Sequence, residues 1–214
     1  MSEAFGVSLK VLLADVPLLL LVGGLLGWIL ARKNFWGKSF VSLLVQLPIV
    51  LPPSVMGFYL LFSLGRVELF QNAGFVFGFP GAALAAFIPA VPIMIQSSRA
   101  AFSSVNRDLE ETALTMGKSK FAVFRKITFP LAKRTLLIGL GLSSARVLGD
   151  FGVTLMVAGN IPGRTQTLPL YIYGQVESLN FAQAHFAALL LVGIGIASLW
   201  FVKSLETGAH ERIY

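Results

Sequence analysis

Five stretches of the chain are almost continuously apolar. Their approximate bounds are residues 11–31, 41–64, 80–98, 135–158 and 181–202. A helix that spans a bilayer needs about 20 mostly apolar residues, and these stretches meet or come close to that length. No charged residue lies between Ser39 and Gly65, or between Leu69 and Ser98. The pattern predicts an all-α integral membrane protein, a bundle of about five transmembrane helices that forms a single domain over residues 1–214.

The composition agrees with a chain that lies mostly in lipid. Of its 214 residues, 56% are hydrophobic and 13% are charged, and its mean hydropathy is +0.78. A soluble domain carries about a quarter charged residues, so an ordinary soluble enzyme and a disordered chain are both excluded. The absence of cysteine excludes disulfides, iron–sulfur clusters, thiolate zinc sites and cysteine nucleophiles. The two histidines, His185 and His210, are far apart in the sequence, so we expect no metal site.

The net charge of +7 is distributed unevenly along the chain. Most lysines and arginines fall in the loop after the first apolar stretch, in residues 99–134 and in the C-terminal tail, whereas the loops of the other side carry Lys10, Arg66 and Arg164. Because positively charged loops stay in the cytoplasm, we expect a multi-pass protein of the cell membrane with its N-terminus outside and its C-terminus in the cytoplasm. Topology accounts for the basic charge, and no nucleic-acid partner is expected.

The polar residues 108–130 are predicted to form two short helices that meet at a glycine. Asp108 fits an N-cap, with Glu111 three residues later as its capping-box partner. Gly117 fits a left-handed residue that ends the first helix, and Ser119 fits the cap of the second. Apolar residues share one face of each helix, namely Leu109, Ala113 and Met116 on the first and Phe121, Phe124 and Ile127 on the second.

The residues alone leave two uses open for this segment. Pro130 is expected to limit the second helix, and two short helices of this kind suit a membrane surface, with basic side chains facing lipid phosphates. The spacing also resembles the EAA loop of ABC importer permeases. It reads Glu111-Thr112-Ala113, then Gly117 after three residues, Ile127 after nine more and Phe129-Pro130 after one more. Thr112 and Phe129 stand where the family pattern has alanine and leucine.

What the resemblance implies is a cytoplasmic coupling helix that sits in a cleft of an ATPase subunit. The residues expected to serve this coupling are Asp108, Glu111, Thr112, Ala113, Gly117, Ile127 and Pro130. The chain itself is expected to bind no cofactor. Its two Gly-Lys-Ser tripeptides, at 37–39 and 117–119, lack the glycine that a P-loop needs five residues earlier, because Arg32 and Thr112 stand there. ATP and Mg are therefore expected on the partner ATPase.

Several intramembrane residues are candidates for a pore or gate. Arg146 and Asp150 are four residues apart, which places them on one helix face. A lone charge in the bilayer core costs about 3 kcal/mol or more, so we expect the two to pair. A gating pair and a purely structural pair remain equally open. Pro52 and Pro53 are expected to weaken the second helix, either beside a translocation path or as a packing kink.

The resemblance extends to the molybdate permease subfamily over residues 47–57, 146–152 and 160–169, with Asp150 where the subfamily has glutamate. It implies a homodimer, two cytoplasmic ATPase subunits and an external molybdate-binding protein, in the membrane of a bacterium or archaeon. The expected function is import of molybdate, with tungstate as an extension, by alternating access. Candidates at the outer mouth, for an oxyanion or for docking a partner protein, are Asn160, Arg164, Thr165 and Thr167.

Three alternatives accompany this hypothesis. The first is a sulfate or thiosulfate permease of the same class. The second is an intramembrane aspartyl protease that uses Asp15 and Asp150, although the GxGD signature fails because Val147 stands at its first glycine. Asp15 is otherwise expected to be an interface residue near the outer end of the first span. The third alternative is a passive channel or membrane scaffold.

Overall fold

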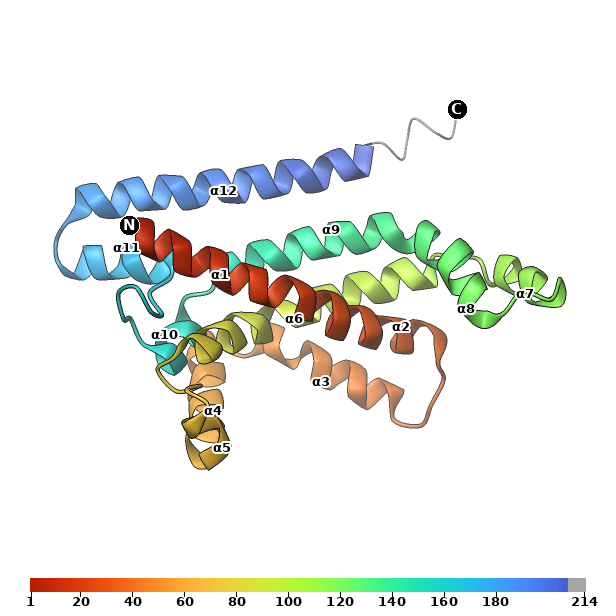
Figure 1. Cartoon of the computed structure of the whole chain (residues 1–214), viewed down its shortest axis with the longest axis horizontal. Helices are drawn as coiled ribbons and strands as arrows, with labels where there is room; N and C mark the ends of the chain where they lie inside the picture. Colours follow the sequence, from red (N-terminus) through yellow and green to blue (C-terminus); the bar gives the residue numbers. More distant parts are fainter. Residues whose placement is uncertain (208–214) are drawn as a thin grey trace.

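The computed structural model describes residues 1–207, and His210 lies outside the described residues. All regular elements in the described part are helices (Figure 1). In chain order they are α1 Ser2–Leu18, η1 Leu19–Gly23, α2 Gly24–Arg32, α3 Lys38–Val50, α4 Pro53–Arg66, α5 Glu68–Asn72, α6 Phe79–Ser103, α7 Arg107–Thr115, α8 Lys120–Val123, η2 Phe124–Thr128, α9 Phe129–Leu148, α10 Gly152–Ala158, α11 Leu168–Glu177 and α12 Phe181–Thr207. The two η elements are π-helical turns within longer helices.

Three helical runs are long and apolar enough to cross a bilayer, and the number rises to five if each of two bent pairs is one span. The first run, Ser2–Arg32, starts earlier than the predicted residues 11–31. The polar residues before position 11 do not stop the helix, because a helix has no need to be apolar outside the lipid. The prediction of an all-α bundle of about five spans agrees with this structure.

The second predicted span is not one helix. Its two arms, α3 and α4, meet at an angle of 112°. Pro52 is extended, with ψ 138°, and Pro53 opens α4. Two consecutive prolines donate no backbone N–H, and each disfavours helical geometry in the residue before it, so the chain leaves the helix at this point. Each arm is roughly 20 Å long at 1.5 Å per residue, too short to cross the bilayer alone.

The fourth predicted span is also bent. One helical run covers Lys120–Leu148, and α10 follows it at an angle of 57°. The prediction that Pro130 limits the preceding helix is wrong, since α8, η2 and α9 form one continuous run through that proline. A π-helical turn just before Pro130 shifts the backbone hydrogen-bond partners, which accommodates a residue without an N–H.

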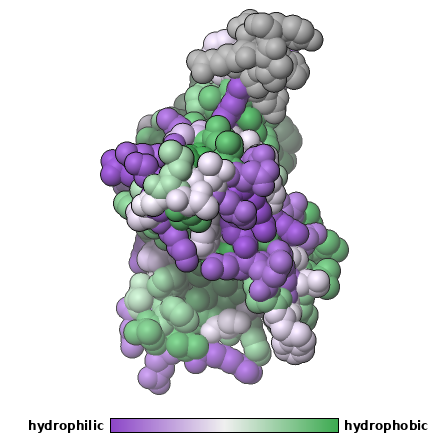
Figure 2. Space-filling view, turned by 90° about the vertical axis from the view of Figure 1, so that its right-hand side faces the viewer, coloured by the Kyte–Doolittle hydropathy of each residue, from purple (hydrophilic) through white to green (hydrophobic). Residues whose placement is uncertain are grey.

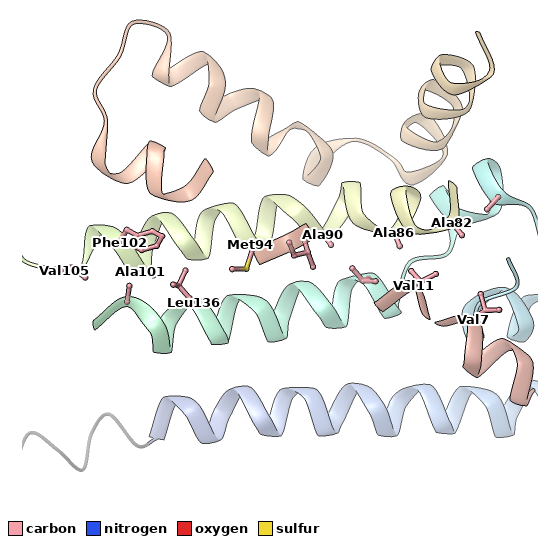
Figure 3. Packing of buried hydrophobic residues seen from close by; sticks show 14 residues of the cluster. Val7, Val11, Ala82, Ala86, Ala90, Met94, Ala101, Phe102, Val105 and Leu136 are labelled. Atoms are coloured by element: carbon pink, nitrogen blue, oxygen red, sulfur yellow. The ribbon is translucent and has the colours of Figure 1, made fainter. Parts of the chain in front are cut away.

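Helix α6 lies at the centre of the bundle and packs against α9, α2, α10 and α1. Small side chains allow these close approaches, and Ala86, Ala90 and Met94 of the central cluster lie along its buried side (Figure 3). A methyl group added at Gly27 would lie 2.3 Å from Cβ of Ser98, and one at Gly139 would lie 2.2 Å from Cβ of Ser97. Such contacts hold membrane helices together without a hydrophobic driving force.

Helix α12 forms one side of the molecule, beside α9 and α11 (Figure 1). Much of its surface is open, and it exposes large apolar side chains such as Leu189, Ile196 and Trp200. The α2–α3 loop and the α7–α8 segment lie together at one end of the bundle, whereas the N-terminus and α11 lie at the other end. The bundle therefore has two distinct ends, and the candidate residues divide between them.

Candidate functional site

Residues 107–128 form a protruding segment, named the elbow here, which comprises α7, the turn at Gly117, α8 and η2 (Figure 1). The prediction that Asp108 caps α7 is wrong. Asn106 is the N-cap, and its Oδ1 accepts a hydrogen bond from the backbone N–H of Asp108 at 2.9 Å. Asn and Asp cap equally well, so the chain takes the cap two residues earlier. Glu111 is consequently an exposed residue inside the helix and no capping-box partner.

The corner of the elbow has the predicted geometry. Gly117 is left-handed, with φ +82°, and no atom lies within 4 Å of a side chain built there. The N–H of Gly117 donates to the carbonyl of Leu114, and the N–H of Lys118 donates to that of Ala113, which ends α7. Ser119 caps α8 by accepting from the N–H of Ala122 at 3.2 Å. The corner is therefore a fixed turn whose outer side is open.

The elbow carries exposed apolar side chains among its charges. Figure 2 shows this end of the molecule, where hydrophilic and hydrophobic residues lie side by side. Met116 is 74% exposed and Phe121 is 72% exposed, and Leu109 is also open. Of the predicted apolar stripe on α7, only Ala113 is buried. Large apolar residues on a charged, protruding segment are typical of a surface that another protein covers.

An ion pair fixes the elbow to the end of the first span. Arg32 Nη2 lies 2.8 Å from Glu110 Oε1, and the same carboxylate oxygen accepts a hydrogen bond from the hydroxyl of Thr128. Arg32 also donates to the carbonyl of Val105 at 3.4 Å. One carboxylate thus joins α2, α7 and η2. Sequence reasoning missed all three partners, because a pair between residues 78 positions apart has no periodic signal.

The second ion pair lies in the break between α9 and α10. Arg146 Nη1 is 3.2 Å from Asp150 Oδ1, so the predicted pair is confirmed. The two residues do not share one helix face, however, since α9 ends at Leu148. The other oxygen of Asp150 accepts from the backbone N–H of Thr154 at 3.0 Å and from its hydroxyl at 2.8 Å. Asp150 therefore holds the first turn of α10 in place.

The two broken helix pairs pack against each other. A side chain added at Gly152 would lie 2.9 Å from Cβ of Pro53, and one added at Gly57 would lie 2.9 Å from Cβ of Met156. The structure thus brings the proline break of α3–α4 next to the Asp150 break of α9–α10. Irregular backbone at membrane depth is tolerated where protein or a wet cavity covers it; here α10 packs on one side of the proline break, while Pro52 and Pro53 themselves are exposed.

The loop of residues 159–167 lies at the end opposite the elbow. Thr165 accepts from the N–H of Ile161 and donates to the carbonyl of Gly159, and Asn160 bonds with Gln166 and Leu170, so these two predicted residues hold the loop together. Thr167 is buried, and its hydroxyl has no partner among the described residues.

Arg164, in the same loop, is exposed. Together with Lys10 it lines a cavity of about 640 Å³. The wall of this cavity therefore carries two positive charges, and the carboxylate of Glu3 lies close to Gly163 in the same wall.

Asp15 differs from its expected place. It is fully buried in the bundle rather than at an interface, and neither carboxylate oxygen has a hydrogen-bond partner among the described residues. Its neighbours one turn away on the same face, Val11 and Leu19, belong to the central apolar cluster. No group of three or more residues suited to hold a metal ion occurs in the described part of the chain.

Comparison with known families and proteins gives consistent results. Residues 23–210 match the family model described as "Binding-protein-dependent transport system inner membrane component". The molybdenum transport system permease protein ModB of Haemophilus influenzae is 38% identical over 95% of this chain and 92% of its own length. The sulfate transport system permease protein CysW of Synechococcus elongatus is 32% identical over 100% of this chain and 78% of its own length.

A solved structure shares the fold. A chain of the MetNI methionine ABC transporter, solved in inward-facing conformations, superposes with a TM-score of 0.67 over 96% of this chain and 95% of its own length. Its sequence identity is 15%, so this likeness concerns the fold alone.

Proposed function

Because the chain belongs to the binding-protein-dependent transport system inner membrane component family, we propose that it is the permease subunit of an ABC importer for molybdate, with tungstate as a related oxyanion. The chain is a membrane-embedded transport component and not an enzyme, which excludes the aspartyl protease alternative. Its partners are ATPase subunits, which bind ATP and Mg, and an external binding protein. We further propose that two copies of the chain form the pathway.

The observation that carries this proposal is the elbow. It exposes Met116 and Phe121, which a partner protein can cover. Its second helix, α8, is continuous with η2 and α9. The run Lys120–Leu148 is one continuous helix, roughly 43 Å long at 1.5 Å per residue. A movement of α8 therefore also moves the other end of this helix, next to the Arg146–Asp150 break. Because α10 packs on α4, the movement also reaches the broken helix pair α3–α4.

The ion pair of Glu110 supplies the second connection. Since it ties α7 and η2 to the end of α2, an ATPase that moves the elbow also moves the first span. When the ATPases bind nucleotide and close, they favour one of two orientations that the first span and α9 can take. A ligand shifts a population in this way when it binds one state better than the other. We assign Glu111, Thr112, Ala113, Gly117, Ile127 and Pro130 to this coupling region, with Asp108 in the first turn of α7.

The molybdate assignment is supported by similarity over the whole chain. The identity is higher to a molybdenum permease than to a sulfate permease, 38% against 32%. At the outer mouth, Arg164 and Lys10 line one cavity and are suited to meet an oxyanion. Sulfate import remains the second candidate. The two are separated by measuring which oxyanion, delivered by its binding protein, stimulates ATP turnover of the assembled complex.

The coupling role is tested by Gly117→Leu, with Gly74→Leu as the matched control. Both glycines are left-handed, with φ +82° and +68°, and both face open space, so both variants place a side chain on a left-handed residue that it does not clash with. Only Gly117 lies in the elbow. We expect Gly117→Leu to insert normally but to lose ATPase binding and uptake, whereas Gly74→Leu keeps both. Normal uptake by Gly117→Leu would contradict the coupling role.

A further inference from the structure

A cavity of about 420 Å³ lies where the end of α2 meets the elbow. Its walls come from α2, α7, α8 and η2 and from Lys33, which follows α2. This volume is within the range of ligand pockets. Met116 and Phe121, the most exposed apolar side chains of the elbow, do not line it. Glu111, which is assigned above to the coupling region, does line it, so the cavity lies beside the exposed apolar surface of the elbow and shares one residue with the coupling region.

The charges that line the cavity are mostly positive. Glu110 is already paired with Arg32 and hydrogen-bonded to Thr128. The remaining charged side chains are Lys33, Arg107 and Lys120, against Glu111 alone. None of these four makes an ion pair within residues 1–207. The cavity therefore has an unbalanced positive charge that suits an anion.

The arginine at the wall has an unused donor. The side chain of Arg32 is 10% exposed, and its Nε is buried with no hydrogen-bond partner among the described residues. A buried donor without a partner costs more free energy than a hydrogen bond gains. Because this Nε is shielded by protein atoms and Arg32 is paired with Glu110, the charge available to a ligand in the cavity comes from Lys33, Arg107 and Lys120.

The cavity also lies at the right depth for a lipid headgroup. Trp28 forms part of its wall, and Lys33 Nζ lies 5.9 Å from the centre of the Trp28 ring. Tryptophan is enriched at the level of the headgroups, and lysine next to a spanning helix attracts anionic lipid. The first spanning run ends at Arg32, in the same wall.

We propose that this cavity binds the phosphate of an anionic phospholipid, such as phosphatidylglycerol. Lys33, Arg107 and Lys120 surround the headgroup, and Arg32 fixes the α2 wall of the site through its pair with Glu110. The lipid thereby braces the elbow against the first span, because it contacts α2, α7 and α8 together. This inference does not depend on which anion the protein transports, since the lipid is retained without any turnover.

The test uses the full chain, purified from vesicles of phosphatidylcholine with 20 mol% phosphatidylglycerol, with native mass spectrometry to count retained lipid. The variant is Lys33→Gln/Arg107→Gln. The matched control is Lys38→Gln/Lys118→Gln, which removes the same charge from the same end but from residues that do not line the cavity. We expect about tenfold weaker retention of phosphatidylglycerol in the first variant, and wild-type retention in the control.

Two outcomes would overturn the proposal. Equal losses in both double variants would show general attraction to the surface charge instead of a site. Inorganic phosphate that binds the lipid-free protein and competes away phosphatidylglycerol at millimolar concentration would assign the cavity to a soluble anion. Lys120→Gln supplies an independent check, because its side chain is exposed and its loss leaves the fold intact. It should lower retention in the same direction.

Discussion

The Arg32–Glu110 and Arg146–Asp150 ion pairs use the same chemistry for different purposes. In each, an arginine meets a carboxylate that also accepts a threonine hydroxyl, Glu110 from Thr128 and Asp150 from Thr154. The Arg146–Asp150 pair is local, four residues apart, and it fixes one bend. The pair of Glu110 joins positions 78 residues apart and connects three elements. The local pair fixes a bend between two helices, whereas the distant pair joins the end of α2 to the elbow.

Burial differs between the pairs as well. The side chain of Asp150 is 1% exposed and that of Arg146 is 32% exposed, whereas the distant pair is 10% and 18% exposed. Removal of one member of a buried pair leaves an uncompensated charge, which costs more than the pair itself contributes. Variants of the two acids should therefore separate a loss of folding from a loss of coupling.

The largest effect is expected from Asp150→Ala. It removes the partner of Arg146 and the acceptor for both bonds from Thr154, so we expect a loss of about 3 kcal/mol in unfolding free energy. Asp150→Asn keeps an acceptor for Thr154 and should lose roughly half as much. Chemical denaturation of the purified protein in detergent measures both. Wild-type stability of Asp150→Ala would show that the bend does not depend on this carboxylate.

Glu110→Gln should reduce transport more than stability. The variant loses the ion pair but keeps an acceptor for Thr128, and we expect a cost of about 1–2 kcal/mol. Uptake should fall about tenfold while the protein inserts normally, because the neutral amide that replaces the carboxylate holds Arg32, and with it α2, less firmly. For stability, the control is Glu111→Gln, an exposed neighbour without an ion pair in the described structure, which should change unfolding by about 0.5 kcal/mol or less.

The distant pair can also be tested by exchange. Arg32→Glu combined with Glu110→Arg restores opposite charges at the same two positions. A double-mutant cycle should then give a coupling energy of about 1 kcal/mol or more between the two sites. Additive losses in the cycle would mean that the contact of 2.8 Å contributes nothing on its own.

The smallest effect concerns the cap of α7. Asn106→Ala should destabilise the elbow by about 1 kcal/mol, because the side chain that accepts from the N–H of Asp108 is lost. Asp108→Ala removes only a favourable negative charge in the first turn of the helix and should destabilise the elbow by about 0.3 kcal/mol. Amide hydrogen exchange in α7 distinguishes the two. A larger effect from Asp108→Ala would show that Asp108 is the N-cap, as the sequence pattern predicted.

Local signals predicted much of this structure. Apolar length predicted the helical runs that are long enough to cross a bilayer. The positive φ of Gly117 and the cap at Ser119 were predicted from the residue types, and the Arg146–Asp150 pair was predicted from its four-residue spacing, although the expected shared helix face is absent. The breaks between α3 and α4 and between α9 and α10 could be predicted only in part. Consecutive prolines indicated a weak point at Pro52, but they carry no signal for the angle of 112° or for the packing of α4 against α10.

Long-range contacts were invisible to the same reasoning. Arg32 counted as one of several basic loop residues, and Glu110 stood next to the residue that carried the motif. Nothing in the spacing distinguishes Glu110 from Glu111, although one is paired and the other is open. The assignment of roles to two adjacent acids required the fold.

The most direct test of the coupling proposal uses the absence of cysteine from the chain. Phe121→Cys introduces a single reactive group at the exposed elbow, and Arg164→Cys introduces one at the opposite end. A membrane-impermeant maleimide should label Phe121→Cys only from the cytoplasmic side, and the bound ATPase subunit should block that labelling, while Arg164→Cys is labelled from outside in both cases. Labelling of Phe121→Cys from outside, or labelling that the ATPase leaves unchanged, would contradict the proposed role of the elbow.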